Sequence, residues 1–219
     1  MKIFLKKATT LIVAFFMMFS SCNMAFSSKI AYAADANVTT CDELGKTYYG
    51  FQLTSVKNIP KINSTVMQFT HVKTGAKLMY LKNDDTQRVF DISFRTPTSD
   101  NSGVNHIIEH SVLDGSKNYP VKSPFQEMLK SSLGSFINAM TGNDYTTFPA
   151  ASTNEQDLKN LMGVYLDAVF YPNVTTDPRI FKQEGWRYEL PSKDSDLTIN
   201  GVVYNEMKGD YSNPQWLLR

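Results

Sequence analysis

Residues 103–116 read GVNHIIEHSVLDGS and contain two of the three histidines in this 219-residue sequence. The polar residues Asp100, Asn101 and Ser102 come directly before and are typical of a helix start, so the sequence predicts a helix that begins near Gly103. Apolar residues recur along this stretch at helical spacing and predict one face packed in a core: Val104, Ile107, Ile108 and Val112.

His106 and His110 are four residues apart, so both rings project from one face of that helix and can reach a single metal ion. Glu109 lies on the same stripe and can take a proton from water beside the metal. The alternative is a solvated helix face that carries these residues by chance. With so few histidines, such a match arises in on the order of one chain in several hundred. The sequence therefore predicts a zinc hydrolase centre with Glu109 as its base.

A third zinc ligand must come from elsewhere in the chain, because catalytic zinc usually takes three protein ligands. His71 is one candidate, although its place in a strand pattern favours a structural role. Glu206 is another: residues 201–209 (GVVYNEMKG) place it on the helical side of two valines, where a carboxylate needs a partner. Glu184 and Glu189 are rivals, either as ligands or as acceptors for a histidine N–H. Spacing alone leaves the choice open.

The remaining patterns predict a mixture of helices and antiparallel strands. Alternating or β-rich runs predict strands at 64–72, 77–81, 88–95, 135–141 and 145–151. Helical spacing and helix-start residues predict helices at 124–133 and 154–171. Strict alternation of strand and helix is missing, so we expect an α+β fold, a mostly antiparallel sheet with helices packed on one face.

The N-terminus has the features of an export signal. Three lysines precede an apolar run at residues 8–19, which is too short for a stable bilayer span, and Ala31-Tyr32-Ala33 matches a signal peptidase site. We expect residues 1–33 to be a signal peptide cleaved near Ala33, with no stable membrane insertion afterwards, and the protein to be secreted or in the cell envelope. An alternative is lipidation at Cys22.

After this cleavage the chain has a negative balance of charge. Four of the 22 basic residues are removed and all 21 acidic residues remain, which gives no indication of nucleic-acid binding. Cys41 would be the one cysteine left, so an internal disulfide is excluded. We expect residues 34–50 to be a polar lead-in and residues 51–219 to form one domain.

The string His106 to His110 is the inverted zinc motif H-x-x-E-H, and the likeness to one family extends well beyond it. The sequence resembles the pitrilysin/insulinase family of inverzincins, specifically its presequence protease branch, over nearly all of residues 51–209. The segments that carry the resemblance are 94–97 (FRTP), 103–116, 124–125 (PF), 136–141 (FINAMT), 184–187 (EGWR) and 201–209.

The resemblance implies a zinc metalloendopeptidase that hydrolyses unfolded oligopeptides. It implies that Glu206 is the third zinc ligand, that Glu109 activates water, and that Asn138 and Ala139 hold an extended peptide at a sheet edge.

Members of this branch are several times longer and have two similar halves. The resemblance therefore implies an N-terminal, truncated metalloprotease domain that needs the missing C-terminal half for full activity. The alternative is a non-catalytic, exported peptide-binding or structural module with the same fold.

Overall fold

The computed structural model describes residues 41–215, and the chain divides into two compact units at Asp84/Asp85. The predicted signal peptide and Cys22 lie outside the described residues. None of the helices within residues 41–215 combines the length and the apolar content that crossing a bilayer requires.

The first unit is an antiparallel sheet of four strands in the order β1-β2-β3-β4. The strands are β1 (Thr47–Tyr48), β2 (Phe51–Ile59), β3 (Ser64–His71) and β4 (Lys77–Lys82), with a 3-10 turn, η1 (Pro60–Ile62), after β2. The predicted hairpin at 64–81 is confirmed as β3–β4. Alternate residues on one side of β3, Met67 and Phe69, are buried with Tyr48 and Leu53 and form the small core of this unit.

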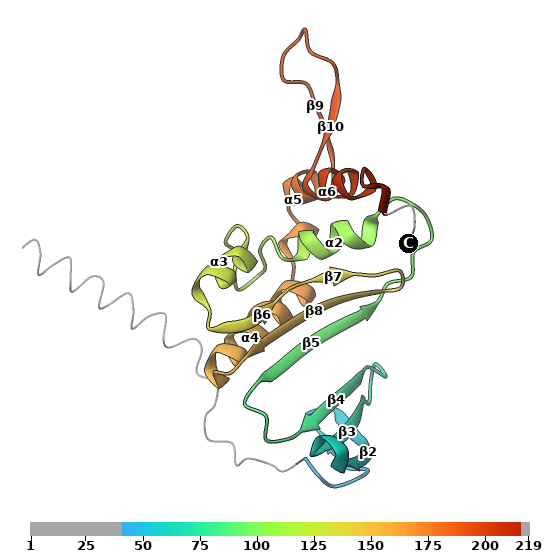
Figure 1. The fold of residues 1–219 in the computed structure, drawn as a ribbon, viewed down its shortest axis with the longest axis vertical. Coiled ribbons are helices and arrows are strands. Elements are labelled where there is room, and N and C mark those ends of the chain that lie inside the picture. Colours follow the sequence, from blue (N-terminus) through green and yellow to red (C-terminus); the bar gives the residue numbers. More distant parts are fainter. Residues whose placement is uncertain (1–40, 216–219) are drawn as a thin grey trace, which may run out of the picture. The chain divides into compact units, whose positions relative to one another are not determined.

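The second unit contains an antiparallel sheet in the order β5-β8-β6, with β7 also paired to β8. Its strands are β5 (Arg88–Arg95), β6 (Gly134–Ile137), β7 (Met140–Thr141) and β8 (Tyr145–Ser152). The helices of this unit are α2 (Val104–Val112), α3 (Pro124–Ser131), α4 (Glu155–Phe170), the 3-10 turn η2 (Asn173–Thr175), α5 (Pro178–Glu184) and α6 (Val202–Tyr211). A two-stranded hairpin, β9 (Arg187–Glu189) and β10 (Thr198–Asn200), extends away from the helices (Figure 1).

One hydrophobic core joins the sheet to three helices. Phe148 and Ala150 alternate along β8 and face this core, with Phe90, Ile92 and Phe94 of β5 packed beside them as the alternation predicted. The helices contribute residues from the end of α2, from α3 and from α4: Val112, Leu113, Met128, Leu161, Tyr165 and Ala168. The predicted α+β class, antiparallel strands with helices on one face, is confirmed.

Helix α4 forms where its apolar period predicts it. Asn154 caps its start by accepting a hydrogen bond from the backbone N–H of Asp157 (3.0 Å), and Leu158, Leu161 and Tyr165 are buried. Burial raises the pKa of Tyr165 well above its ordinary value, so the hydroxyl keeps its proton.

The predicted strand at 135–141 is not continuous. It is divided into β6 and β7 at Asn138 and Ala139, where the Tyr165 hydroxyl donates to the carbonyl of Asn138 (2.8 Å), while the Asn138 N–H still bonds to the carbonyl of Pro149 on β8 (3.1 Å). A buried hydroxyl needs an acceptor, and the break in the strand supplies one.

Two helix starts differ in detail from the prediction. No side chain caps α2: Gly103 takes a left-handed conformation (φ 70°) that a residue with a Cβ rarely adopts, and Asp100 accepts instead from the N–H of Ser102. The hydroxyl of Ser123, before α3, donates to Asp114 (2.7 Å) rather than capping the helix.

A buried carboxylate ties α4 to the loop that follows α2. Asp167 is 7% exposed and accepts from the Ser116 hydroxyl (2.6 Å), the Asn118 N–H (2.8 Å) and the Asn118 side-chain amide (2.7 Å). Removal of the Asp167 carboxylate would therefore leave these three donors of Ser116 and Asn118 without their acceptor.

We expect Asp167→Ala to lower the free energy of unfolding by about 2–4 kcal/mol, because buried donors are left without an acceptor. Urea unfolding followed by circular dichroism measures the change. The matched control is Asp194→Ala, which removes an exposed carboxylate and should change stability by no more than about 0.5 kcal/mol. Equal effects of the two substitutions would contradict the structural role of Asp167.

Candidate metal centre

Three potential metal ligands from two helices come together in the second unit. His106 and His110 lie on α2 with ring centroids 4.9 Å apart, and Glu206 reaches them from α6. One oxygen of Glu206 lies 3.7 Å from Nε2 of His106 and 3.5 Å from Nε2 of His110. All three donor atoms are within 4.8 Å of one another. Of the candidates that spacing left open, Glu206 is the one that joins the histidine pair.

The expected placement of Glu206 on a buried apolar face of its helix is wrong. Its side chain is 48% exposed, and of the two neighbouring valines only Val203 is buried while Val202 is 43% exposed. Glu206 therefore does not lie on a buried apolar face. Its helix α6 borders α2, and this placement brings the carboxylate to the histidines (Figure 1).

The predicted apolar face of α2 is only half buried. Ile107 and Val112 are in the core, whereas Val104 and Ile108 are 49% and 51% exposed. Glu109, expected on a face away from the core, is instead 5% exposed. The buried side of α2 therefore includes Glu109 in place of Val104 and Ile108, because α2 packs against β7 and β8 as well as against α5.

Buried Glu109 is held by a hydroxyl from β7. Thr141 donates to one of its carboxylate oxygens at 2.5 Å, which is the short end of the range for a hydrogen bond to a charged acceptor. Sequence reasoning missed Thr141, since a threonine in a strand gives no signal of such a partner.

Glu184, at the end of α5, lies behind His110. It is 8% exposed, and one of its oxygens is 3.3 Å from Nδ1 of His110. This hydrogen bond raises the pKa of His110 and lowers the pKa of Glu184. In the neutral tautomer that donates Nδ1–H to Glu184, Nε2, which lies 3.5 Å from an oxygen of Glu206, is left free for a metal. Glu184 thus takes the acceptor role rather than the ligand role.

The other two rivals have partners elsewhere. Glu189 accepts from Arg187 (3.2 Å) and Asn200 within the β9–β10 hairpin. His71, in the first unit, bonds Thr74 through Nδ1 (2.7 Å), as expected for a structural histidine.

Two glycines allow α5 and α6 to approach closely. A Cβ on Gly201, the residue before α6, would overlap the carbonyl of Gly185, the residue after α5. A Cβ on Gly185 would itself lie 2.9 Å from the carbonyl oxygen of Phe181 and 3.0 Å from Ile107 of α2. This backbone contact fixes where α6 begins, and Glu206 follows four residues after Val202, about one helical turn into α6.

Asn138 and Ala139, the predicted substrate-binding pair, lie in the break between β6 and β7. β6 is the last strand in the order β5-β8-β6, so within residues 41–215 its outer side is a sheet edge. The structure therefore places the pair at an edge of the kind the prediction requires, and their binding role stays a prediction.

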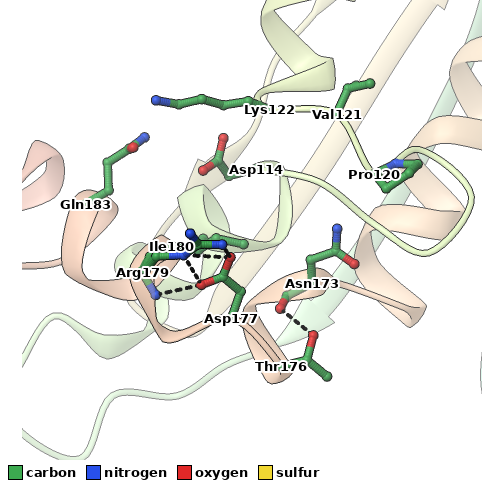
Figure 2. Close-up of a pocket in the computed structure, with 10 residues that line it drawn as sticks. All are labelled: Asp114, Pro120, Val121, Lys122, Asn173, Thr176, Asp177, Arg179, Ile180 and Gln183. Atoms are coloured by element: carbon green, nitrogen blue, oxygen red, sulfur yellow. Dashed lines mark hydrogen bonds and ion pairs between the residues drawn. The ribbon is translucent and has the colours of Figure 1, made fainter.

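A cavity of about 530 Å³ lies apart from the histidine pair. It is lined by the loop 114–122 together with η2 and α5, and Figure 2 shows Asp177 and Arg179 paired at its wall. None of His106, His110 and Glu206 lines it. Its size alone assigns it no chemistry.

Comparison with known proteins identifies relatives over most of this chain. Residues 93–195 match the family model for insulinase, peptidase family M16. Protein HypA of Clostridium perfringens is 51% identical over 171 residues, which are 78% of this chain and 18% of that protein. Presequence protease 1, chloroplastic/mitochondrial, of Arabidopsis thaliana is 50% identical over 77% of this chain and 16% of its own length. The chain thus spans less than a fifth of the length of these relatives.

The predicted secretion or cell-envelope location is contradicted by this comparison. Several relatives are named mitochondrial or chloroplastic presequence proteases, which points to an organelle rather than to secretion. The physical cause of the error is that organelle-targeting and secretory segments share features: both are N-terminal and basic, and residues 1–33 contain no acidic residue.

The crystal structure of pitrilysin has a similar fold, with a TM-score of 0.50 and 22% sequence identity over 60% of this chain and 15% of that chain. This likeness bears on the fold, and it agrees with the α+β arrangement of helices on an antiparallel sheet. The family match, which runs from β5 to β9, and the relatives at about half identity show that this chain contains a peptidase M16 (insulinase) domain.

Proposed function

We propose that this chain is the zinc-binding, N-terminal part of a metalloendopeptidase that hydrolyses unfolded oligopeptides. The observation that carries the proposal is the convergence of His106, His110 and Glu206 beside the buried carboxylate of Glu109. The presequence protease names of the relatives support a peptide substrate.

The donor set fits zinc. Two imidazole nitrogens and one carboxylate oxygen form a common set of protein ligands at catalytic zinc. Two atoms that each lie about 2.0–2.2 Å from a tetrahedral ion are about 3.3–3.6 Å apart. The Glu206 oxygen lies 3.5 and 3.7 Å from the two histidine nitrogens, close to that spacing. Zinc, when bound there, supplies Lewis acidity that polarises a carbonyl and acidifies water.

The chain's own residues divide the remaining work. Glu109 accepts a proton from the attacking water at the carboxylate oxygen that Thr141 leaves free, and then passes this proton to the leaving amine. Glu184 orients the ring of His110. Asn138 and Ala139 hold an extended peptide at the β6 edge, and such a site tolerates many sequences because it contacts the peptide backbone more than the side chains.

We expect Glu109→Gln to keep zinc and to lose peptide cleavage by about 100-fold or more, because the amide cannot accept the proton. Zinc content by atomic absorption and cleavage of a quenched fluorescent peptide, with and without chelator, measure the two effects. The control is Glu127→Gln, which changes an exposed glutamate of α3 and should leave both values unchanged.

Cleavage that resists the chelator, or full activity of Glu109→Gln, would rule out the proposed mechanism. Zinc-dependent peptide binding without any cleavage by the native chain would support instead the non-catalytic peptide-binding module.

We expect Gly201→Ala to weaken zinc binding by roughly 10- to 100-fold, the range seen when a group that orients a ligand is lost. The added Cβ overlaps the Gly185 carbonyl and displaces the start of α6, which carries Glu206. Competition with a chromophoric chelator measures the affinity, and circular dichroism checks that the chain is folded.

Gly209→Ala is the matched control, because it adds the same methyl group to the same helix where no atom lies within 4 Å. It should leave zinc affinity unchanged and stabilise α6 by about 0.5–1 kcal/mol. Equal zinc affinities of the Gly201→Ala and native chains would show that the backbone contact does not position Glu206.

A further inference from the structure

We infer that Thr141 is a positioning residue for Glu109: its hydroxyl holds one carboxylate oxygen and leaves the other to receive the proton. This inference rests on the proposed function and adds a residue to it. The starting observation is the hydrogen bond of 2.5 Å from Thr141 Oγ1 to Glu109 Oε2, made to a carboxylate that is 5% exposed. A buried carboxylate without a donor would be costly, so this bond also helps to keep Glu109 in place.

The backbone of β7 fixes where the Thr141 hydroxyl lies. β7 has only two residues, and it is paired to β8 with Thr141 opposite Thr146. Its neighbour on the other side is α2, the helix that carries Glu109 (Figure 1). The β-branched side chain of threonine has few rotamers, so a strand position next to the helix presents the hydroxyl in a defined direction.

The hydroxyls of Thr146 and Thr96 continue a row of polar groups that begins at Thr141. Oγ1 of Thr146, in a side chain that is 5% exposed, lies 3.4 Å from Oγ1 of Thr141 and 2.8 Å from Oγ1 of Thr96. The carbonyl of Thr96 in turn accepts from the side-chain amide of Asn105, on the first turn of α2 (2.7 Å). The polar path thus leaves α2 at Asn105 and returns to it at Glu109.

The carboxylate of Glu109 sets the direction of the Thr141 proton. A hydroxyl has one proton to donate, and a carboxylate can only accept, so Thr141 donates to Glu109 and has no proton left for Thr146, 3.4 Å away. The terminal torsion of a glutamate is broad, and without this donor the plane of the carboxylate is poorly fixed. Thr141 therefore affects the proton transfer through Glu109, and we expect zinc binding not to depend on it.

Two substitutions separate the hydroxyl from the shape of the side chain. Thr141→Val keeps the shape and removes the hydroxyl, whereas Thr141→Ser keeps the hydroxyl. The matched control is Thr198→Val, in β10, where the threonine is exposed and donates to the carbonyl of Glu189. Each variant is compared with the native chain for zinc content, for kcat and KM on the fluorescent peptide, and by NMR of chains labelled with ¹³C at the glutamate carboxyl.

The NMR measurement does not depend on activity. The carboxyl resonance of Glu109 is identified by its loss in Glu109→Gln. We expect Thr141→Val to move this resonance and to lower kcat by roughly 10- to 100-fold, with KM within about twofold and zinc content unchanged. Thr141→Ser should restore the native resonance and kcat, and Thr198→Val should alter neither.

Three results would overturn the inference: a Glu109 resonance that Thr141→Val does not move, a Thr141→Ser variant that behaves like Thr141→Val, or a loss of zinc along with activity in Thr141→Val. If the native chain neither binds zinc nor cleaves peptide, the proposed function fails separately. The resonance then still decides whether Thr141 holds Glu109.

Discussion

A carboxylate that is buried away from water needs a hydrogen-bond donor inside the protein, and this requirement determines several contacts in the second unit of the chain. Glu109 is met by Thr141 from β7, Glu184 is met by His110 from α2, and Asp167 is met by three donors from the loop after α2. Each of these pairings joins elements that are distant in sequence. The helices are therefore fixed to the sheet and to one another by buried polar contacts as well as by the apolar core.

The fold was predictable wherever one periodicity runs without interruption. The alternation in β3 and β5 and the long apolar period of α4 gave strands and a helix with nearly correct ends. β2 was missed because its register shifts between Leu53 and Ser55, which breaks the alternation. α5, β9 and β10 were missed because they are short, and elements of three to seven residues depend on tertiary contacts rather than on a local pattern.

The candidate site was predictable in part. The spacing of His106 and His110 depends only on helix geometry, so it could be derived from sequence. Glu206 could not, because its approach depends on how α6 packs against α2, and the apolar-face argument for it was wrong. Thr141 was beyond reach for the same reason: its hydroxyl meets Glu109 across 32 residues of chain through the pairing of β7 with β8.

The contact between Gly185 and Gly201 has a genetic consequence. Every missense change at position 201 adds a Cβ, and that atom meets backbone rather than a side chain that could rotate away. Small and large replacements at this position therefore meet the same clash, because the Cβ of alanine already overlaps the Gly185 carbonyl. Gly209, eight residues further on and within α6, has open space where its Cβ would lie. Random mutagenesis of residues 201–211 should thus recover alanine at Gly209 far more often than at Gly201.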